Sequence, residues 1–236
     1  MQKKFSGRKL ISVLVAVMLV FAMMPAAAFA QDSGVTVNVK IENVTFTEDA
    51  GSGEPAWTGA LLDAEVTVPS GTTMAEAVET AAAEKNISLE KSSYGYISSV
   101  DGLEAGDAGM MSGWMMTLND WFSDATTYKV EDGDEVILTY SVTGGDDLGA
   151  FWDNNDKTVK ALDISRGELS PSFSSDIKEY TLSLDSEVSE IYIVPVASNK
   201  YFQVRAIVND KEYKANQPVP VEDGTVIEVT CGGSAA

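Results

Sequence analysis

The residues best suited to binding or chemistry are the aromatic side chains in the middle of the chain. Trp114, Trp121 and Phe122 lie within one short stretch, and Asn119 stands in the turn-forming segment between the two tryptophans. Strand alternation puts Trp114 and Met115 on opposite faces, so one of them must face a core. We favour Trp114 as a core residue over a ligand contact. For Trp121 and Phe122, which the pattern places in a turn, the two roles are balanced.

The amino acids that many enzymes use for proton transfer are missing or scarce. The sequence has no histidine and one cysteine, Cys231. Histidine-based triads, imidazole metal ligation and an internal disulfide are therefore excluded. No spacing places two carboxylates across a cleft as a glycosidase requires. We expect a non-enzymatic protein without a cofactor, in which Cys231 is an unreactive residue of a late strand.

Two acidic clusters offer oxygen atoms to a cation. Asp146 and Asp147, together with residues 153–156, lie in a stretch with the composition of a linker. Their spacing does not match a calcium loop, so a solvated linker is favoured over a calcium-stiffened joint. The 131–135 stretch is favoured as a hairpin turn over a metal site. We therefore expect no metal site.

The charge of the chain restricts its partners. The formal net charge is −20, and Lys3, Lys4, Arg8 and Lys9 all lie in the first thirty residues. The remainder is therefore more acidic still, which argues against nucleic acid and anionic membrane surfaces as partners.

The first thirty residues have the pattern of a secretory signal peptide. A basic start precedes an apolar run from Leu10 to Met24, and Ala28-Phe29-Ala30 supplies the small residues of a cleavage site. The run is shorter than the roughly 20 residues that a spanning helix needs, so a membrane anchor is the less favoured alternative. We expect cleavage after Ala30 and a secreted or cell-surface protein without further membrane insertion.

Hydrophobic periodicity predicts a mainly β chain with one helix. Residues 35–42 alternate with a period of two, and Thr73 and Glu76 form a capping box that begins a helix ending near Lys85. After residue 158 no helix signal appears, and short apolar runs separated by turn residues predict a β-sandwich. The fold expected is an N-terminal α+β domain, with one helix on a small sheet, followed by a C-terminal Ig/cadherin-like β-sandwich. Further strands of the first domain are expected at 62–68, 94–100, 114–118 and 135–142.

The first half of the chain carries three motifs, which are YGYISSVDG at 94–102, GWMMTLN at 113–119 and DGDEV at 132–136. Together with the helix before them, they resemble the transcobalamin-like C-terminal domain of exported bacterial proteins. The resemblance implies a β-grasp-like fold for residues 35–143. In the cobalamin carriers of that family, the residues matching Trp114 and Met115 lie near the corrinoid. The candidate ligand-binding residues are accordingly Trp114, Met115, Trp121, Phe122, Asn119 and Tyr96.

The second half carries LDISRGELSPSF at 162–173, followed by Tyr180-Thr181-Leu182. This pattern resembles the cadherin-like β-sandwich domain of bacterial surface proteins and implies a spacer or adhesive module over residues 158–231. Leu169, Phe173 and Tyr180 would then be core residues, and residues 144–157 would be the linker. The stretch is short for that family, which leaves open whether a last strand is missing.

Two functional hypotheses follow. The favoured one is a secreted or cell-surface binding module whose first domain holds cobalamin, a related corrinoid or another small ligand. The alternative is a structural or adhesive extracellular spacer without a small ligand, in which the aromatic residues are core or contact another surface protein or glycan.

Overall fold

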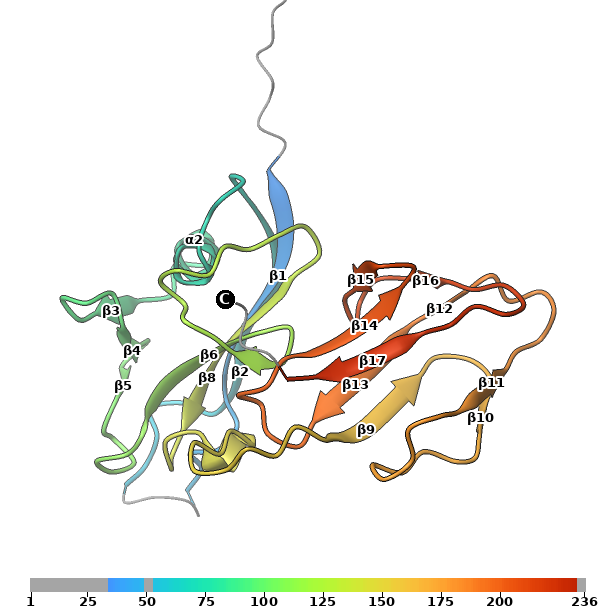
Figure 1. Cartoon of the computed structure of the whole chain (residues 1–236). Helices are drawn as coiled ribbons and strands as arrows, with labels where there is room; N and C mark the ends of the chain where they lie inside the picture. The colour runs from blue at the N-terminus through green and yellow to red at the C-terminus, as the bar shows by residue number, and fades with distance from the viewer. Residues whose placement is uncertain (1–33, 49–52, 233–236) are drawn as a thin grey trace, which may run out of the picture. The chain divides into compact units, whose positions relative to one another are not determined.

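The computed structural model describes residues 34–48 and 53–232, and the predicted signal peptide with its cleavage site lies outside them. Within the described part the chain is mainly β with one α-helix, as the sequence predicts (Figure 1). No helix in these two segments is long and apolar enough to cross a membrane. The described residues from Val35 onward belong to one compact unit, which contains two separate hydrophobic clusters.

A five-stranded sheet forms the centre of the first half, in the order β2-β1-β8-β6-β7. β1 runs parallel to β8, and all other neighbouring strands are antiparallel. The alternating residues of β1 bury one face, as the period of two predicts. The strands are β1 (Val35–Asn43), β2 (Gly59–Val68), β6 (Gly113–Leu118), β7 (Trp121–Phe122) and β8 (Glu135–Ser141).

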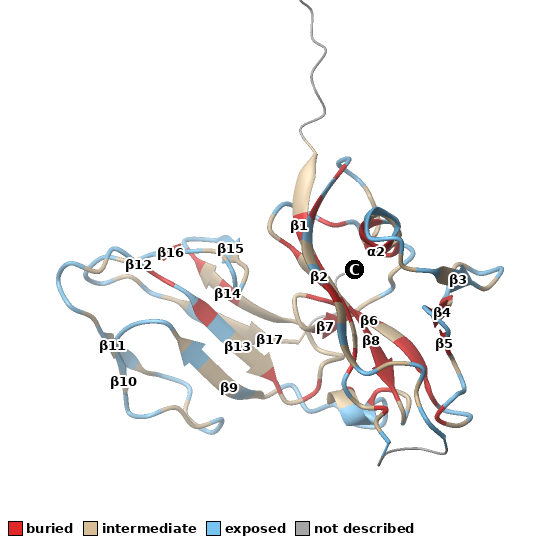
Figure 2. Ribbon diagram, turned by 180° about the vertical axis from the view of Figure 1, so that it is seen from behind, coloured by how far each residue is buried: buried red, intermediate tan, exposed pale blue. Residues whose placement is uncertain are grey.

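One helix, α2 (Met74–Glu84), packs against β1, β2 and β8. It begins at the predicted capping box, because the Thr73 hydroxyl accepts from the Glu76 amide and the Glu76 carboxylate accepts from the Thr73 amide. Such a cap stabilises a helix by about 1 kcal/mol. Figure 2 shows buried residues on α2 and on strands β1, β6 and β8. The helical stripe that faces this core consists of Met74, Ala77, Val78 and Ala81.

Three short strands form a second sheet in the order β3-β4-β5. The predicted strand 94–100 is wrong at its start, because residues 92–96 form a turn and the strand begins at Ile97. In this turn the Ser92 amide donates to the Tyr96 carbonyl at 2.8 Å, and Gly95 has a φ of 82°. The strands are β3 (Leu89–Lys91), β4 (Ile97–Val100) and β5 (Leu103–Glu104).

The second half, from residue 159 to 232, contains strands as its only regular elements, in agreement with the sequence prediction. The strands pair in four small sheets, which are β9 with β13, β10 with β11, β12 with β16, and β14 between β15 and β17. The buried cluster between them consists of Ile191, Ile193, Ala206, Val208 and Val219. The strands are β9 (Val159–Ile164), β10 (Glu168–Ser170), β11 (Thr181–Ser183), β12 (Glu190–Ile191), β13 (Ile193–Ala197), β14 (Val204–Val208), β15 (Lys211–Tyr213), β16 (Val219–Pro220) and β17 (Glu228–Cys231).

Three residues implied to be core in the second half lie outside this cluster. Leu169, Phe173 and Tyr180 are half-buried, and the rings of Phe173 and Tyr180 stack on each other at 5.9 Å. Leu169 lies in β10, which pairs only with β11 in a separate two-stranded sheet. The cadherin-like assignment stays a prediction.

The stretch predicted as a solvated linker is partly ordered. It contains the short 3₁₀ helix η1 (Asp146–Leu148), and the Asp147 carboxylate accepts hydrogen bonds from the preceding turn, including the Val142 amide at 2.7 Å and the Ser141 hydroxyl at 2.6 Å. Burial raises the pKa of Asp147, but these hydrogen bonds outweigh burial, so its pKa lies below the ordinary value for aspartate. Asp147 therefore holds the turn together through both carboxylate oxygens.

Candidate functional site

A cleft of about 750 Å³ opens along β6. It is bounded by the segment 94–97 that leads into β4, the segment 111–116 that includes most of β6, and the segment 122–126 that begins with the last residue of β7. Its remaining lining residues are Ala75, Leu138, Ser141, Gly144 and Tyr201. Four of the six candidate residues lie in this lining, namely Tyr96, Trp114, Met115 and Phe122. Trp121 and Asn119 lie outside it.

Trp114 borders the cleft, but its side chain belongs to the core. Its side chain is 2% exposed, and its indole nitrogen donates to the Leu103 carbonyl at 3.0 Å. The ring stacks on Trp57 at 5.7 Å and meets Tyr140 edge-on at 5.2 Å. The Trp57 indole in turn donates to the Val100 carbonyl at 3.0 Å, which fixes Trp57 against the core. Trp114 is thus the core residue that the sequence favours, and it also borders the cleft.

The outer edge of β6 carries the hydrogen bonding of the cleft. β7 pairs with β6 only at Thr117 and Leu118, so β7 leaves the first part of that edge uncovered. There the Trp114 amide donates to the Tyr96 hydroxyl at 2.8 Å. Gly113 makes this approach possible, because a Cβ at that position would lie 2.5 Å from the Tyr96 hydroxyl oxygen.

Tyr96 is the directional hydrogen-bond donor of the cleft. Burial raises the pKa of its hydroxyl, against the lowering effect of the Trp114 amide, so the group stays protonated at neutral pH. Its oxygen accepts from Trp114, which leaves the hydroxyl hydrogen for a ligand. The charged residue of the lining, Asp124, has a lowered pKa because the Thr126 hydroxyl and amide both donate to it.

Met115 lies on the opposite face of β6 from Trp114, as strand alternation predicts, and it reaches the rim of the cleft. A Cβ added to Gly145 would meet the Met115 methyl carbon at 3.1 Å. The thioether therefore packs closely over the backbone at the start of η1. An unbranched thioether is an adaptable contact for a ligand of irregular shape.

Trp121 and Phe122 are buried residues of strand β7, which corrects their predicted place in a turn and favours the core role of the two left open. They are 6% and 8% exposed and form β7. The Trp121 indole donates to the Tyr201 carbonyl at 3.0 Å, and the Phe122 ring lies 6.0 Å from the Tyr201 ring. Burial comes from a segment about 80 residues further along the chain, which no local pattern reveals. Of the two residues, Phe122 lines the cleft and Trp121 does not.

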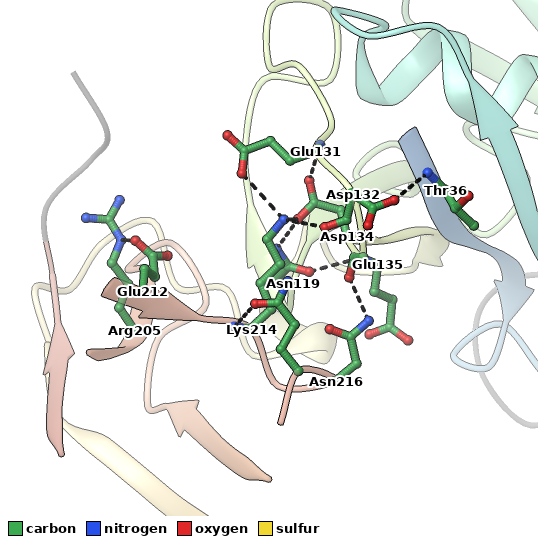
Figure 3. A network of polar contacts seen from close by, with 12 residues as sticks. Thr36, Asn119, Glu131, Asp132, Asp134, Glu135, Arg205, Glu212, Lys214 and Asn216 are labelled. Carbon is green, nitrogen blue, oxygen red and sulfur yellow. Dashed lines mark hydrogen bonds and ion pairs between the residues drawn. The ribbon is translucent and has the colours of Figure 1, made fainter. Parts of the chain in front are cut away.

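Asn119 is a structural residue of the β6–β7 hairpin. Asn119 and Asp120 have φ angles of 50° and 65°, as the tight two-residue hairpin turn requires. The Asn119 amide nitrogen donates to Asp134 at 2.7 Å, and its side-chain oxygen accepts from the Glu135 amide at 3.0 Å (Figure 3). Both ends of the side chain are thereby used inside the fold, and a role in ligand binding is not supported by its position.

Several lining residues were not among the sequence candidates. Tyr94 shares the YGY motif with Tyr96, so this signal was present in the sequence. Met111 belongs to a methionine-rich loop, whereas Tyr201 comes from the second half and carries no local signal. Among the described residues, no group of three or more histidine, cysteine or acidic side chains could hold a metal ion.

Comparison with known proteins adds little about the ligand. A family model described as a domain of unknown function (DUF4430) matches residues 71–142, and no curated protein matches. Among solved structures, haptocorrin in complex with Cbi has 19% identity and a TM-score of 0.36, over 51% of this chain and 28% of the haptocorrin chain. The chain thus spans less than a third of haptocorrin. A protein of Ruminococcus gnavus ATCC 29149, described as a suspected metal-binding protein, has 19% identity and a TM-score of 0.29, over 45% of this chain and 96% of its own.

Proposed function

We propose that this protein is a non-enzymatic binding module, secreted or held at the cell surface, that takes a small ligand in the cleft along β6. The observation that carries the proposal is the apolar rim of this cleft. Tyr94 is 91% exposed, Met111 is 66% exposed and Tyr96 is 43% exposed, although all three are large side chains. Clustered exposed apolar groups around a concavity are typical of a contact surface.

The polar groups of the cleft support binding rather than catalysis. Asp124 is tied to Thr126, and the Ser112 hydroxyl donates to the Gly109 carbonyl at 2.7 Å. Tyr96 stays protonated and offers one donor. Nucleophilic catalysis would need a nucleophile activated by a base within hydrogen-bond reach, and no hydrogen bond in this lining joins such a pair.

The ligand class follows from the same groups. A cleft of about 750 Å³ falls in the range that accepts drug-sized molecules, roughly 300–1,000 Å³. The exposed ring of Tyr94 and the Phe122 side chain in the lining offer aromatic contact, and Tyr96 offers a donor to an oxygen acceptor. A flat ligand with amide or carbonyl groups at its rim fits this description. A corrinoid, which the resemblance of the first half implies, is the specific form of the proposal.

Calorimetric titration of the chain from Gln31 onward with dicyanocobinamide and with cyanocobalamin tests the proposal. We expect saturable binding of at least one of them, weakened several-fold in Tyr94→Ala because that ring lies in the rim. Tyr192→Ala is the matched control, since Tyr192 is 40% exposed and lies outside the lining. Absence of binding heat at high micromolar corrinoid would reject a corrinoid as the ligand. Equal affinities of Tyr94→Ala and Tyr192→Ala would reject the cleft as the binding site.

A further inference from the structure

A segment of the second half lies along β7, the outer strand of the first sheet. The Phe122 amide donates to the Lys200 carbonyl at 3.0 Å, and the Trp121 indole donates to the Tyr201 carbonyl, also at 3.0 Å. Lys200 also forms an ion pair with Asp120 in the β6–β7 turn. Main-chain and side-chain contacts together therefore fix residues 200–201 against this strand.

The segment is itself held rigidly by Asn199, which is fully buried. Its side-chain oxygen accepts from the Phe151 amide at 3.0 Å and from the Tyr201 amide at 3.1 Å. Its amide nitrogen donates to the Phe151 carbonyl at 2.7 Å. In addition, the Lys200 amide donates to the Gly149 carbonyl at 2.9 Å. The backbone that carries Tyr201 is therefore preorganised before any ligand arrives.

A second set of contacts joins the same two halves at the turn before β8. Lys214 forms an ion pair with the buried Asp134 at 2.8 Å and donates to the Asp132 carbonyl at 3.1 Å. The Asn216 side-chain nitrogen donates to the Gly133 carbonyl at 2.6 Å (Figure 3). With contacts at two separate places, the two halves are held against rotation more firmly than a single group of contacts would hold them.

We infer that the second half is part of the ligand site, with Tyr201 as a specificity-determining residue in the wall of the cleft. Tyr201 lies in the lining, is half-buried, and its ring lies 6.0 Å from the Phe122 ring, so it borders the space that a ligand would fill. The inference rests on the proposed function for its ligand. It differs from a spacer role, because a spacer contributes no side chain to the cleft.

The first part of the test needs no ligand. Hydrogen exchange is measured by NMR on the chain from Gln31 onward, at the Phe122 amide and the Trp121 indole, whose acceptors both belong to the second half. We expect both to exchange at least about 100-fold more slowly than free groups, since opening must precede exchange. Asn199→Ala should accelerate both and leave the amides of α2 unchanged. Unprotected exchange of both groups in the unmodified chain would overturn the inference.

The second part uses two probes, dicyanocobinamide and the neutral apolar dye Nile red. Tyr201→Ala should weaken binding of a probe in the cleft by about tenfold, the effect of one lost aromatic contact. Tyr192→Ala should leave the affinity unchanged. Equal affinity of Tyr201→Ala and the unmodified chain would overturn the role of Tyr201. If neither probe binds, the proposed function fails, and hydrogen exchange alone decides whether residues 199–201 form a fixed wall.

Discussion

Replacing Lys214 by methionine should destabilise the protein more than any change at an exposed ion pair. The Lys214 ammonium lies 2.8 Å from Asp134, and the two side chains are 15% and 3% exposed. Asp134 also accepts from the Glu131 amide at 2.6 Å and from Asn119 at 2.7 Å. Methionine keeps the length and apolar stem of lysine, so the substitution removes the charge and little packing.

The magnitude follows from what remains around Asp134. Removing one partner of a buried ion pair costs about 3–5 kcal/mol, because the other charge is left in a poorly solvated place. The Glu131 amide and the Asn119 side chain still donate to the carboxylate, so we expect a loss at or just below the bottom of this range, about 2–3 kcal/mol. For a chain of this size, each kcal/mol lowers Tm by about 2–4 °C. Lys214→Met should therefore lower Tm by roughly 4–12 °C.

The assay is thermal and urea unfolding followed by circular dichroism, with a double-mutant cycle that adds Asp134→Asn. Because the second change removes the stranded charge, the double variant should lose less than the sum of the two single losses. Lys91→Met is the matched control. Lys91 and Glu79 form a pair at 2.7 Å that is 41% and 34% exposed, and such pairs contribute about 0–1 kcal/mol. Equal losses for Lys214→Met and Lys91→Met would refute the reasoning.

Three further outcomes are expected. Gly113→Ala should lower the free energy of unfolding in urea by about 1–3 kcal/mol, because the new Cβ would displace the Tyr96 hydroxyl. The NMR resonance of the Trp114 amide should shift for the same reason, and an unchanged resonance would contradict this. Thr73→Ala should lose about 1 kcal/mol through the missing helix cap, seen as a lower urea midpoint at unchanged slope. Asp147→Asn should destabilise at pH 7. Because the pKa of Asp147 is lower in the folded than in the unfolded chain, its carboxylate stabilises the fold at pH values above the unfolded pKa. This stabilisation is lost as the pH falls through the folded pKa, so the difference in stability between Asp147→Asn and the unmodified chain should shrink below about pH 4 in urea unfolding.

Much of the first sheet is predictable because its signals are local. The alternation in β1, the capping box at Thr73 and the stripe at Met74 each depend on residues a few positions apart. The same holds for Trp114 as core, since strand alternation puts Trp114, Met116 and Leu118 on one side of β6, and all three are buried in the same cluster. For these elements, local propensity and tertiary packing agree.

The candidate site was harder to predict, because its walls come from distant parts of the chain. Trp121 and Phe122 are buried by Tyr201, and Asn119 is engaged by Asp134 across the β6–β8 pairing. A single sequence gives no signal for such long-range contacts. Tyr96 was found through its motif, but its bond to the Trp114 amide depends on the close approach that Gly113 permits.

The short strand β7 has a consequence for how this protein can be handled. β7 is an edge strand of the five-stranded sheet, and the amide of its residue Phe122 donates to the Lys200 carbonyl. A fragment that ended before this backbone would have an exposed edge strand with two aromatic side chains. Exposed edge strands of this kind promote self-association of β proteins. The first half expressed alone should therefore aggregate, and binding to the cleft should be measured with both halves present.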